Sequence, residues 1–158
     1  MRLEGKTAII TGAGSGFGEG IAKKLACEGA AVIVCDVNEE GAERVAHEIK
    51  KAGGRALFTN ADVTRGDAVQ RMVDRAVVDF DGLDILVNNA GVSHKRKPML
   101  DVTEDELDRI LAVNVKGLFH TANAAIPALR NRGSGVHGVY PRTSLRYASR
   151  HRSYAAIS

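Results

Sequence analysis

A glycine-rich turn between an apolar run and a helical pattern is the feature of this 158-residue sequence that most constrains its fold. The run Thr7–Thr11 is rich in β-branched residues, which favour a strand, and it leads directly into Gly12, Gly16 and Gly18. Beyond the turn, Glu19–Ala26 has the apolar spacing of a helix. A strand, a glycine turn and a helix N-terminus together form a cradle for an anion such as a pyrophosphate, because backbone N–H groups and the helix dipole point toward it.

The glycine spacing leaves two interpretations open. The dinucleotide-binding pattern G-x-G-x-x-G would need a glycine where this chain has Phe17, and the glycines fit G-x-x-x-G-x-G instead. A phosphate loop of the Walker type is excluded, because no Gly-Lys-Ser/Thr follows the turn. A glycine turn that binds no ligand is the alternative to a nucleotide site.

Strand-like and helical patterns alternate along the next part of the chain. We expect further strands at 30–36 and 83–87, a strand that runs into a loop within 55–63, and amphipathic helices at 39–51 and 67–80. Such alternation predicts an α/β fold, a Rossmann-type doubly wound parallel sheet with helices on both faces. The apolar residues that we expect the helix at 67–80 to bury are Val69, Met72, Val73, Ala76 and Val77.

A longer helical region follows the last of these strands. Thr103 and Glu106 have the spacing of a capping box, and helical spacing continues to Leu129, with Gly117 and Pro127 as irregularities. Asn114 is an amide among apolar neighbours within this region. Taken alone, such an amide is more often structural than catalytic.

Three polar residues and one glycine stand at the carboxyl ends of the expected strands. Gly12, Asp36, Asp62 and Asn88 each stand at a carboxyl end, which is the edge where such sheets bind ligands. Asp36 lies 24 residues after Gly12, close to the place of a carboxylate that holds the adenosine ribose hydroxyls. Its charge would repel a 2′-phosphate, so it favours NAD over NADP. The alternative for Asp36 is a helix N-cap.

Composition limits the class of protein. The length fits a single domain, and neither an apolar run of about 18 residues nor an apolar N-terminal segment is present, so we expect no membrane span and a cytoplasmic protein. Cys27 and Cys35 lack metal-site spacing, so we expect two buried, reduced thiols and no metal site. The pI near 9.0 reflects residues 133–158, which hold four arginines and no acidic residue, and therefore does not indicate nucleic-acid binding.

Four motifs occur in order: Thr11–Gly18 (TGxxxGxG), Asp62-Val63, Asn88–Gly91 (NNAG) and Asn114–Gly117 (N-x-x-G). With these motifs the chain resembles the short-chain dehydrogenase/reductase superfamily over residues 1 to about 135. The resemblance implies that residues 1–135 form an NAD-binding Rossmann domain, the N-terminal half of the family fold, so we expect the sheet to be incomplete at its C-terminal side. It also implies hydride transfer between a nicotinamide and an alcohol or ketone, and homo-oligomers for full-length family members.

The resemblance further implies a role for each matching position. Asn114 would be the first member of the family's Asn-Ser-Tyr-Lys catalytic set, holding a water in a proton relay. The cofactor would be bound along its length: the pyrophosphate by Gly12, Ser15, Gly16, Phe17 and Gly18, the ribose by Asp36, the adenine by Asp62 and Val63, and the middle of the molecule by Asn88, Ala90 and Gly91.

Residues 136–158 depart from the family pattern and form an atypical basic tail. Tyr154 follows Asn114 by 40 residues, close to the family interval for the catalytic tyrosine, but Ser158 stands where Tyr-x-x-x-Lys requires lysine. Without a neighbouring ammonium, a tyrosine with a pKa of about 10 is a poor base at pH 7. We therefore expect impaired turnover, with a catalytically inactive nucleotide-binding fragment as the alternative. One hypothesis is a reading-frame change near residue 137; a natural short variant is the other.

Overall fold

The computed structural model describes residues 1–133 and 135–139, which form a five-stranded parallel sheet covered by helices. The strand order is β3-β2-β1-β4-β5, and every neighbouring pair is parallel. The predicted Rossmann-type α/β class is therefore confirmed. The strands are β1 (Thr7–Thr11), β2 (Ala31–Asp36), β3 (Arg55–Asn60), β4 (Ile85–Asn88) and β5 (Val136–Val139).

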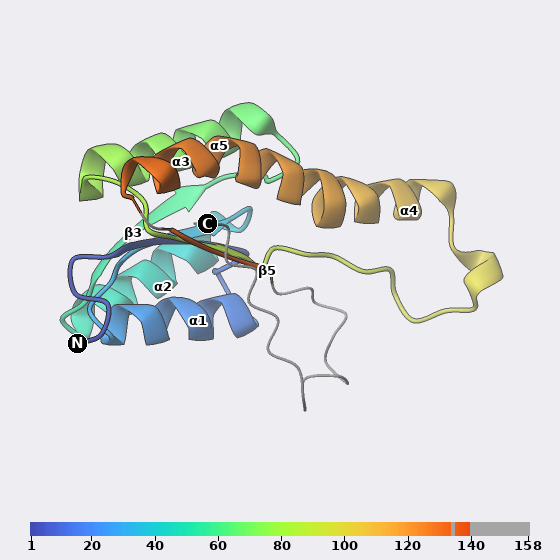
Figure 1. Cartoon of the computed structure of the whole chain (residues 1–158). Coiled ribbons are helices and arrows are strands. Elements are labelled where there is room, and N and C mark those ends of the chain that lie inside the picture. Colours follow the sequence, from blue (N-terminus) through green and yellow to red (C-terminus); the bar gives the residue numbers. More distant parts are fainter. Residues whose placement is uncertain (134, 140–158) are drawn as a thin grey trace.

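Helices lie on both faces of the sheet (Figure 1). One face carries α1 (Gly16–Cys27) and α2 (Glu39–Lys51), and the other carries α3 (Gly66–Phe80) and α5 (Gly117–Asn131). Because side chains alternate along a strand, Ile10 packs toward the first pair of helices and Ile9 toward the second. Burial on both faces explains why β1 and β2 are almost continuously apolar.

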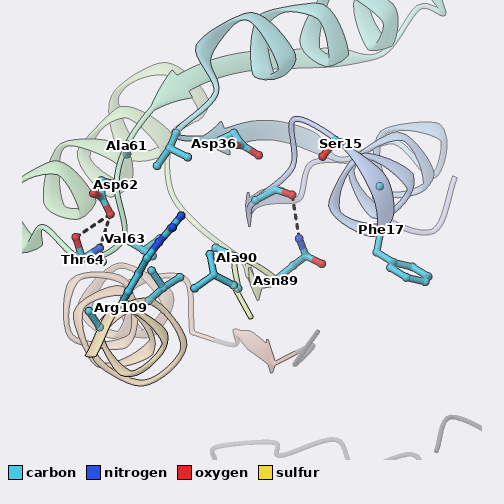
Figure 2. Close-up of a pocket in the computed structure, with 17 residues that line it drawn as sticks. Ser15, Phe17, Asp36, Ala61, Asp62, Val63, Thr64, Asn89, Ala90 and Arg109 are labelled. Carbon is cyan, nitrogen blue, oxygen red and sulfur yellow. Dashed lines mark hydrogen bonds between the residues drawn. The ribbon is translucent and has the colours of Figure 1, made fainter. Parts of the chain in front are cut away.

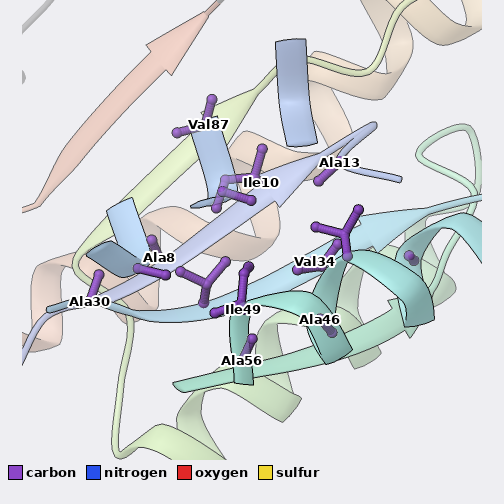
Figure 3. Packing of buried hydrophobic residues seen from close by; sticks show 14 residues of the cluster. Ala8, Ile10, Ala13, Ala30, Val34, Ala46, Ile49, Ala56 and Val87 are labelled. Carbon is purple, nitrogen blue, oxygen red and sulfur yellow. The ribbon is translucent and has the colours of Figure 1, made fainter. Parts of the chain in front are cut away.

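Two apolar clusters hold these layers together. Figure 3 shows the cluster under α1 and α2, in which Ile49 and Ala46 of α2 pack over Val34, Ala56 and Ala8 of the strands. The second cluster joins α3 and α5 to the opposite face of the sheet. The carboxyl ends of β1, β2 and β3 are thereby fixed side by side.

A long helical segment crosses from the sheet into solvent (Figure 1). After the short helix η1 (Met99–Asp101), it consists of α4 (Glu104–Leu111), a π-helical turn η2 (Ala112–Lys116) and α5. The capping box is present, since Thr103 Oγ1 accepts from Glu106 N and the Glu106 carboxylate accepts from Thr103 N. The helix is irregular in the π turn directly before Gly117, which itself has α-helical geometry, and Pro127 is accommodated inside α5.

Three details differ from the sequence-based expectations. Val77 is 44% exposed, because it lies at the edge of the stripe that α3 buries. Cys27 is exposed while Cys35 is buried, since Cys27 is rotated by about 100° from the buried Ala26 on α1. Residues Val136–Val139, which the sequence placed in the basic tail, form strand β5 and pair with β4. His137 and Gly138 interrupt the apolar pattern of a buried strand, so this strand is recognisable only from its backbone pairing.

No helix in the described part of the chain is long and apolar enough to cross a membrane.

Candidate functional site

A pocket of about 840 Å³ opens at the carboxyl ends of β1, β2 and β3 and is closed on one side by α4 and η2 (Figure 2). This is the edge of the sheet where the sequence predicted a site. Nine of the predicted cofactor-binding residues line the pocket: Gly12, Ser15, Gly16, Phe17, Asp36, Asp62, Val63, Ala90 and Gly91. Gly18, Asn88 and Asn114 are not among its lining residues, and Tyr154 lies outside the described residues.

The glycine turn lies close to neighbouring backbone. A Cβ at Gly12 would lie 2.8 Å from the Cα of Ala90, and the φ of +64° at this residue favours glycine. A Cβ at Gly18 would lie 2.2 Å from the carbonyl oxygen of Gly12. Gly18 therefore shapes the turn from behind the pocket rather than lining it.

The helix that follows the turn presents an open N-terminus to the pocket. Ser15 is the N-cap residue of α1, and its side chain makes no capping hydrogen bond. Both Ser15 and the first helical residue, Gly16, line the pocket. The free N–H groups of the first helical turn and the positive end of the dipole suit a negatively charged group.

Asp36 is held by the glycine turn. Its Oδ2 accepts a hydrogen bond from Gly14 N at 2.8 Å, and its Oδ1 accepts one from Asn38 N at 2.9 Å. The N-cap of α2 is Asn38, whose side chain accepts from Gly41 N. The alternative that Asp36 is a helix N-cap is therefore wrong, and its carboxylate lines the pocket instead.

Thr64 orients the carboxylate of Asp62. Asp62 Oδ1 accepts from Thr64 N at 2.9 Å and from Thr64 Oγ1 at 2.8 Å (Figure 2). Among the described residues no donor reaches Asp62 Oδ2. Because Asp62 lines the pocket, this second oxygen is available to a ligand N–H group. The sequence indicated Asp62 but gave no sign of its partner Thr64.

The two asparagines at the end of β4, Asn88 as its last residue and Asn89 directly after it, have different environments. Asn89 lines the pocket, and its Nδ2 donates to the carbonyl oxygens of Thr11 (2.9 Å) and Gly12 (3.0 Å), so it joins the ends of β1 and β4. Asn88 is 6% exposed, and its Nδ2 lies 2.6 Å from Nε2 of His137 on β5. Since the amide nitrogen can only donate, His137 Nε2 is the acceptor, and burial lowers the pKa of this imidazole.

Asn88 was predicted to bind the cofactor and Asn89 was not, although both stand in the same Asn88–Gly91 motif. Only the direction of each side chain in the folded loop separates them.

Asn114 lies in the π turn and holds the loop after β4. Its Oδ1 accepts from Val92 N and its Nδ2 donates to Val92 O, both at 2.9 Å. Val92 itself lines the pocket. The amide thus fixes one wall of the pocket through two hydrogen bonds, and π turns of this kind are frequent at functional sites.

The remaining lining residues were not predicted from the sequence to bind the cofactor. They come from loops and from α4 and η2, and they are Val37, Ala61, Thr64, Asn89, Val92, Arg109, Ala112 and Val113.

The strand order, the helices on both faces and a crevice at the carboxyl ends of the strands define a doubly wound α/β protein of the Rossmann class. The family model described as short chain dehydrogenase matches residues 6–136. The chain therefore belongs to the short-chain dehydrogenase family, as its motifs indicated.

Known relatives agree with this assignment. The chain is 48% identical over 136 residues to 4-formylbenzenesulfonate dehydrogenase of Comamonas testosteroni, covering 86% of this chain and 54% of that protein. It is 39% identical over 136 residues to the 7alpha-hydroxysteroid dehydrogenase of Escherichia coli, covering 86% and 52%. The chain thus spans about half the length of the curated relatives it matches.

Solved structures show the same fold. A 3-ketoacyl-(acyl-carrier-protein) reductase of Brucella melitensis, in complex with NADH, matches with a TM-score of 0.82 and 45% identity over 87% of this chain and 57% of that one. A 7 alpha-hydroxysteroid dehydrogenase, in complex with NADH and 7-oxo glycochenodeoxycholic acid, matches with a TM-score of 0.82 and 38% identity over 87% and 53%.

Proposed function

We propose that this chain binds NAD(H) in the pocket between the glycine turn, Asp36, Asp62 and α4. The observation that carries the proposal is the chemistry of the pocket walls. They place an uncapped helix N-terminus, a carboxylate held by the turn and a carboxylate with a free oxygen along one crevice. These groups suit a pyrophosphate, a ribose diol and an amino-substituted base, in that order.

The residues fit such a cofactor in detail. The close packing at Gly12 and Gly18 lets the α1 N-terminus approach a pyrophosphate, with Ser15 and Gly16 beside it. Asp36 would accept hydrogen bonds from ribose hydroxyls, and its negative charge favours NAD(H) over NADP(H). Asp62 Oδ2 would accept from the adenine amine, with Val63 against the base.

The middle of the cofactor would lie along Ala90 and Gly91. The hydrogen bond to His137 turns the Asn88 amide toward β5, so Asn88 would support this loop from behind.

We further propose that the chain descends from an NAD(H)-dependent oxidoreductase acting on an alcohol or ketone. A bound nicotinamide ring would supply the site that gives or receives hydride. The solved relatives in complex with NADH support this lineage. Asn114 would position the wall beside the nicotinamide through Val92, and Tyr154 is the candidate for the catalytic acid or base.

Binding without turnover is the second candidate function. It is favoured by Ser158, which stands where the Tyr-x-x-x-Lys pattern requires the lysine that lowers the pKa of the tyrosine. The other features of the proposal are a small-molecule partner, no nucleic-acid partner, a cytoplasmic location and, for a full-length family member, a homo-oligomer. The free thiols of Cys27 and Cys35 are compatible with a reducing compartment.

A titration of NADH fluorescence combined with a turnover assay tests both candidates. Saturable NADH binding with no turnover over a panel of alcohols and ketones supports the nucleotide-binding function alone. Turnover above background supports the oxidoreductase. The absence of any NADH binding at millimolar concentration would reject both.

A further inference from the structure

Arg109 of α4 has no role in the motifs that identify the family, yet it lies on the wall of the pocket. Among the described residues that line the pocket, it is the one basic side chain; the two acidic ones are Asp36 and Asp62. Its guanidinium makes no hydrogen bond or ion pair with any residue in the part of the chain that the structure describes. The side chain is exposed, so its charge remains hydrated.

The lack of a partner is informative because partners are near. Asp105 stands four residues before Arg109 on α4, a spacing that favours an ion pair, but no such pair forms. The arginines of α3 behave differently: Arg71 pairs with Asp67 at 3.0 Å and Arg75 with Asp79 at 2.9 Å. Arg109 instead extends from α4 into the pocket beside Val63 (Figure 2).

The position of Arg109 distinguishes between two kinds of ligand group. The anion-binding end of the pocket is the α1 N-terminus at Ser15, whereas Arg109 lies beside Val63 at the other end (Figure 2). That end combines the apolar side chains of Val63 and Val113 with the free oxygen of Asp62. Apolar walls and one acceptor suit a flat heteroaromatic base with an amino group, and a guanidinium stacks well on the face of such a base.

We propose that Arg109 closes over the adenine of bound NAD(H), stacking its guanidinium on the face of the base while Asp62 binds the edge. Arg109 is then a positioning residue that acts at the adenine end. This inference rests on the proposed function, because it names a further contact to the same cofactor.

The test compares ligands that contain or lack adenine. The variants are Arg109→Met, which keeps a long unbranched side chain without the charge, and Arg109→Lys, which keeps the positive charge but lacks the planar guanidinium group that stacks on a base. Arg130→Met is the matched control, since Arg130 is also exposed and lies on α5, about 30 Å further along the same helical segment. The full chain is titrated with NADH, ADP-ribose, NADPH and reduced nicotinamide mononucleotide, and the melting temperature of each variant is recorded.

We expect Arg109→Met to weaken NADH and ADP-ribose binding by the same factor, about 5- to 20-fold, as expected for loss of a stacked cation. Binding of reduced nicotinamide mononucleotide and the melting temperature should not change. Arg109→Lys should fall between Arg109→Met and the wild type, and Arg130→Met should match the wild type.

Three results would overturn the inference while leaving the proposed function in place. They are unchanged ADP-ribose binding by Arg109→Met, an equal loss for reduced nicotinamide mononucleotide, and a larger loss for NADPH than for NADH, which would assign Arg109 to a phosphate. If the wild-type chain bound neither NADH nor ADP-ribose, the proposed function would fail and this inference with it.

Discussion

Gly18 and Gly20 lie two residues apart on α1, but only Gly20 has space for a methyl group. A Cβ at Gly18 would lie 2.2 Å from Gly12 O, whereas a Cβ at Gly20 meets no atom within 4 Å. We expect Gly18→Ala to displace the glycine turn, to lower the free energy of unfolding by about 1–3 kcal/mol and to weaken NADH binding at least about tenfold. Urea unfolding and NADH titration measure the two effects.

Gly20→Ala is the matched control for this substitution. Because Gly20 is exposed within a helix, alanine should stabilise the protein by about 0.5–1 kcal/mol and leave NADH binding unchanged. If Gly18→Ala and Gly20→Ala had the same free energy of unfolding and the same affinity for NADH, close packing at Gly18 would not shape the turn.

At the scale of elements, four charged side chains join α1 to α2 and to the glycine turn. Arg44 pairs with Glu19 at 2.7 Å and with Glu48 at 2.8 Å, and it also donates to the carbonyl oxygen of Gly14 at 3.1 Å. Lys23 pairs with the same two glutamates. The hydrogen bonds from Arg44 and Lys23 lower the pKa of the Glu19 carboxyl from 4.5 to about 2.

This lowered pKa predicts how the network depends on pH. A carboxyl whose pKa is lower in the folded state contributes stability that is present above about pH 4.5 and is lost as the pH falls toward 2. We expect Glu19→Gln to lower the melting temperature at pH 7 by about 2–4 °C, and the difference from wild type to shrink as the pH is lowered from 5 to about 2. Melting curves between pH 7 and 2.5 provide the measurement.

Glu43→Gln is the control, because Glu43 is exposed on α2 and makes no ion pair within the described residues. It should show no such pH-dependent difference. If the difference in melting temperature between wild type and Glu19→Gln stayed constant down to pH 2.5, the stabilisation would not come from the ionised Glu19 carboxylate.

At the scale of the whole molecule, a buried carboxylate connects three distant segments. Asp84 is 5% exposed and accepts from Lys6 Nζ and Thr7 N, both at 2.9 Å, while Arg132 Nε lies 3.6 Å away. Arg132 Nε is itself buried and has no hydrogen-bond partner among the described residues. The carboxylate thus joins the start of β1 and the end of α5 to the segment before β4.

Removing this carboxylate should leave the charge of Arg132 poorly compensated. We expect Asp84→Ala to lower the free energy of unfolding by about 3–5 kcal/mol, measured by urea denaturation. Asp81→Asn is the control: Asp81 is fully exposed and lies 3.8 Å from Arg132, so its loss should change stability by less than about 0.5 kcal/mol. If Asp84→Ala and Asp81→Asn lowered the free energy of unfolding by similar amounts, burial of the Asp84 carboxylate would not account for its contribution to stability.

An apolar stripe runs along the outer side of the long helical segment. Leu107, Leu111, Val115 and Phe119 follow one another at four-residue spacing, and their exposed fractions are 47%, 47%, 59% and 64%. Residues at this spacing share one face of a helix, so the stripe is a continuous apolar surface. We expect the chain to self-associate through it, with a mass that rises with concentration in light scattering.

Phe119→Glu should shift this chain toward the monomer, whereas Arg130→Glu, a charge change elsewhere on the segment, should not. Concentration-independent monomers of the wild type would reject the association.

The sequence by itself determined the order and type of the strands before β5 and of the α-helices between them, because each depends on local periodicity. The glycine turn, the alternation of strands and helices and the capping box at Thr103 are all readable within short windows. Placing Asp36 and Asp62 at one edge also needed only the sequence, since parallel strands bring their carboxyl ends together. The strand at Val136–Val139 was missed because its polar and glycine residues pair through the backbone alone.

Only the tertiary structure decided what each side chain does at that edge. Asn89 faces Thr11 and Gly12 while its neighbour Asn88 meets His137, and Arg109 reaches the pocket from a helix far along the chain. The two asparagine contacts join residues separated by 49 and 78 positions, Asn88 with His137 and Thr11 with Asn89. No local pattern encodes such distances, because the partner of each side chain is set by how the loops and helices pack once the sheet has formed.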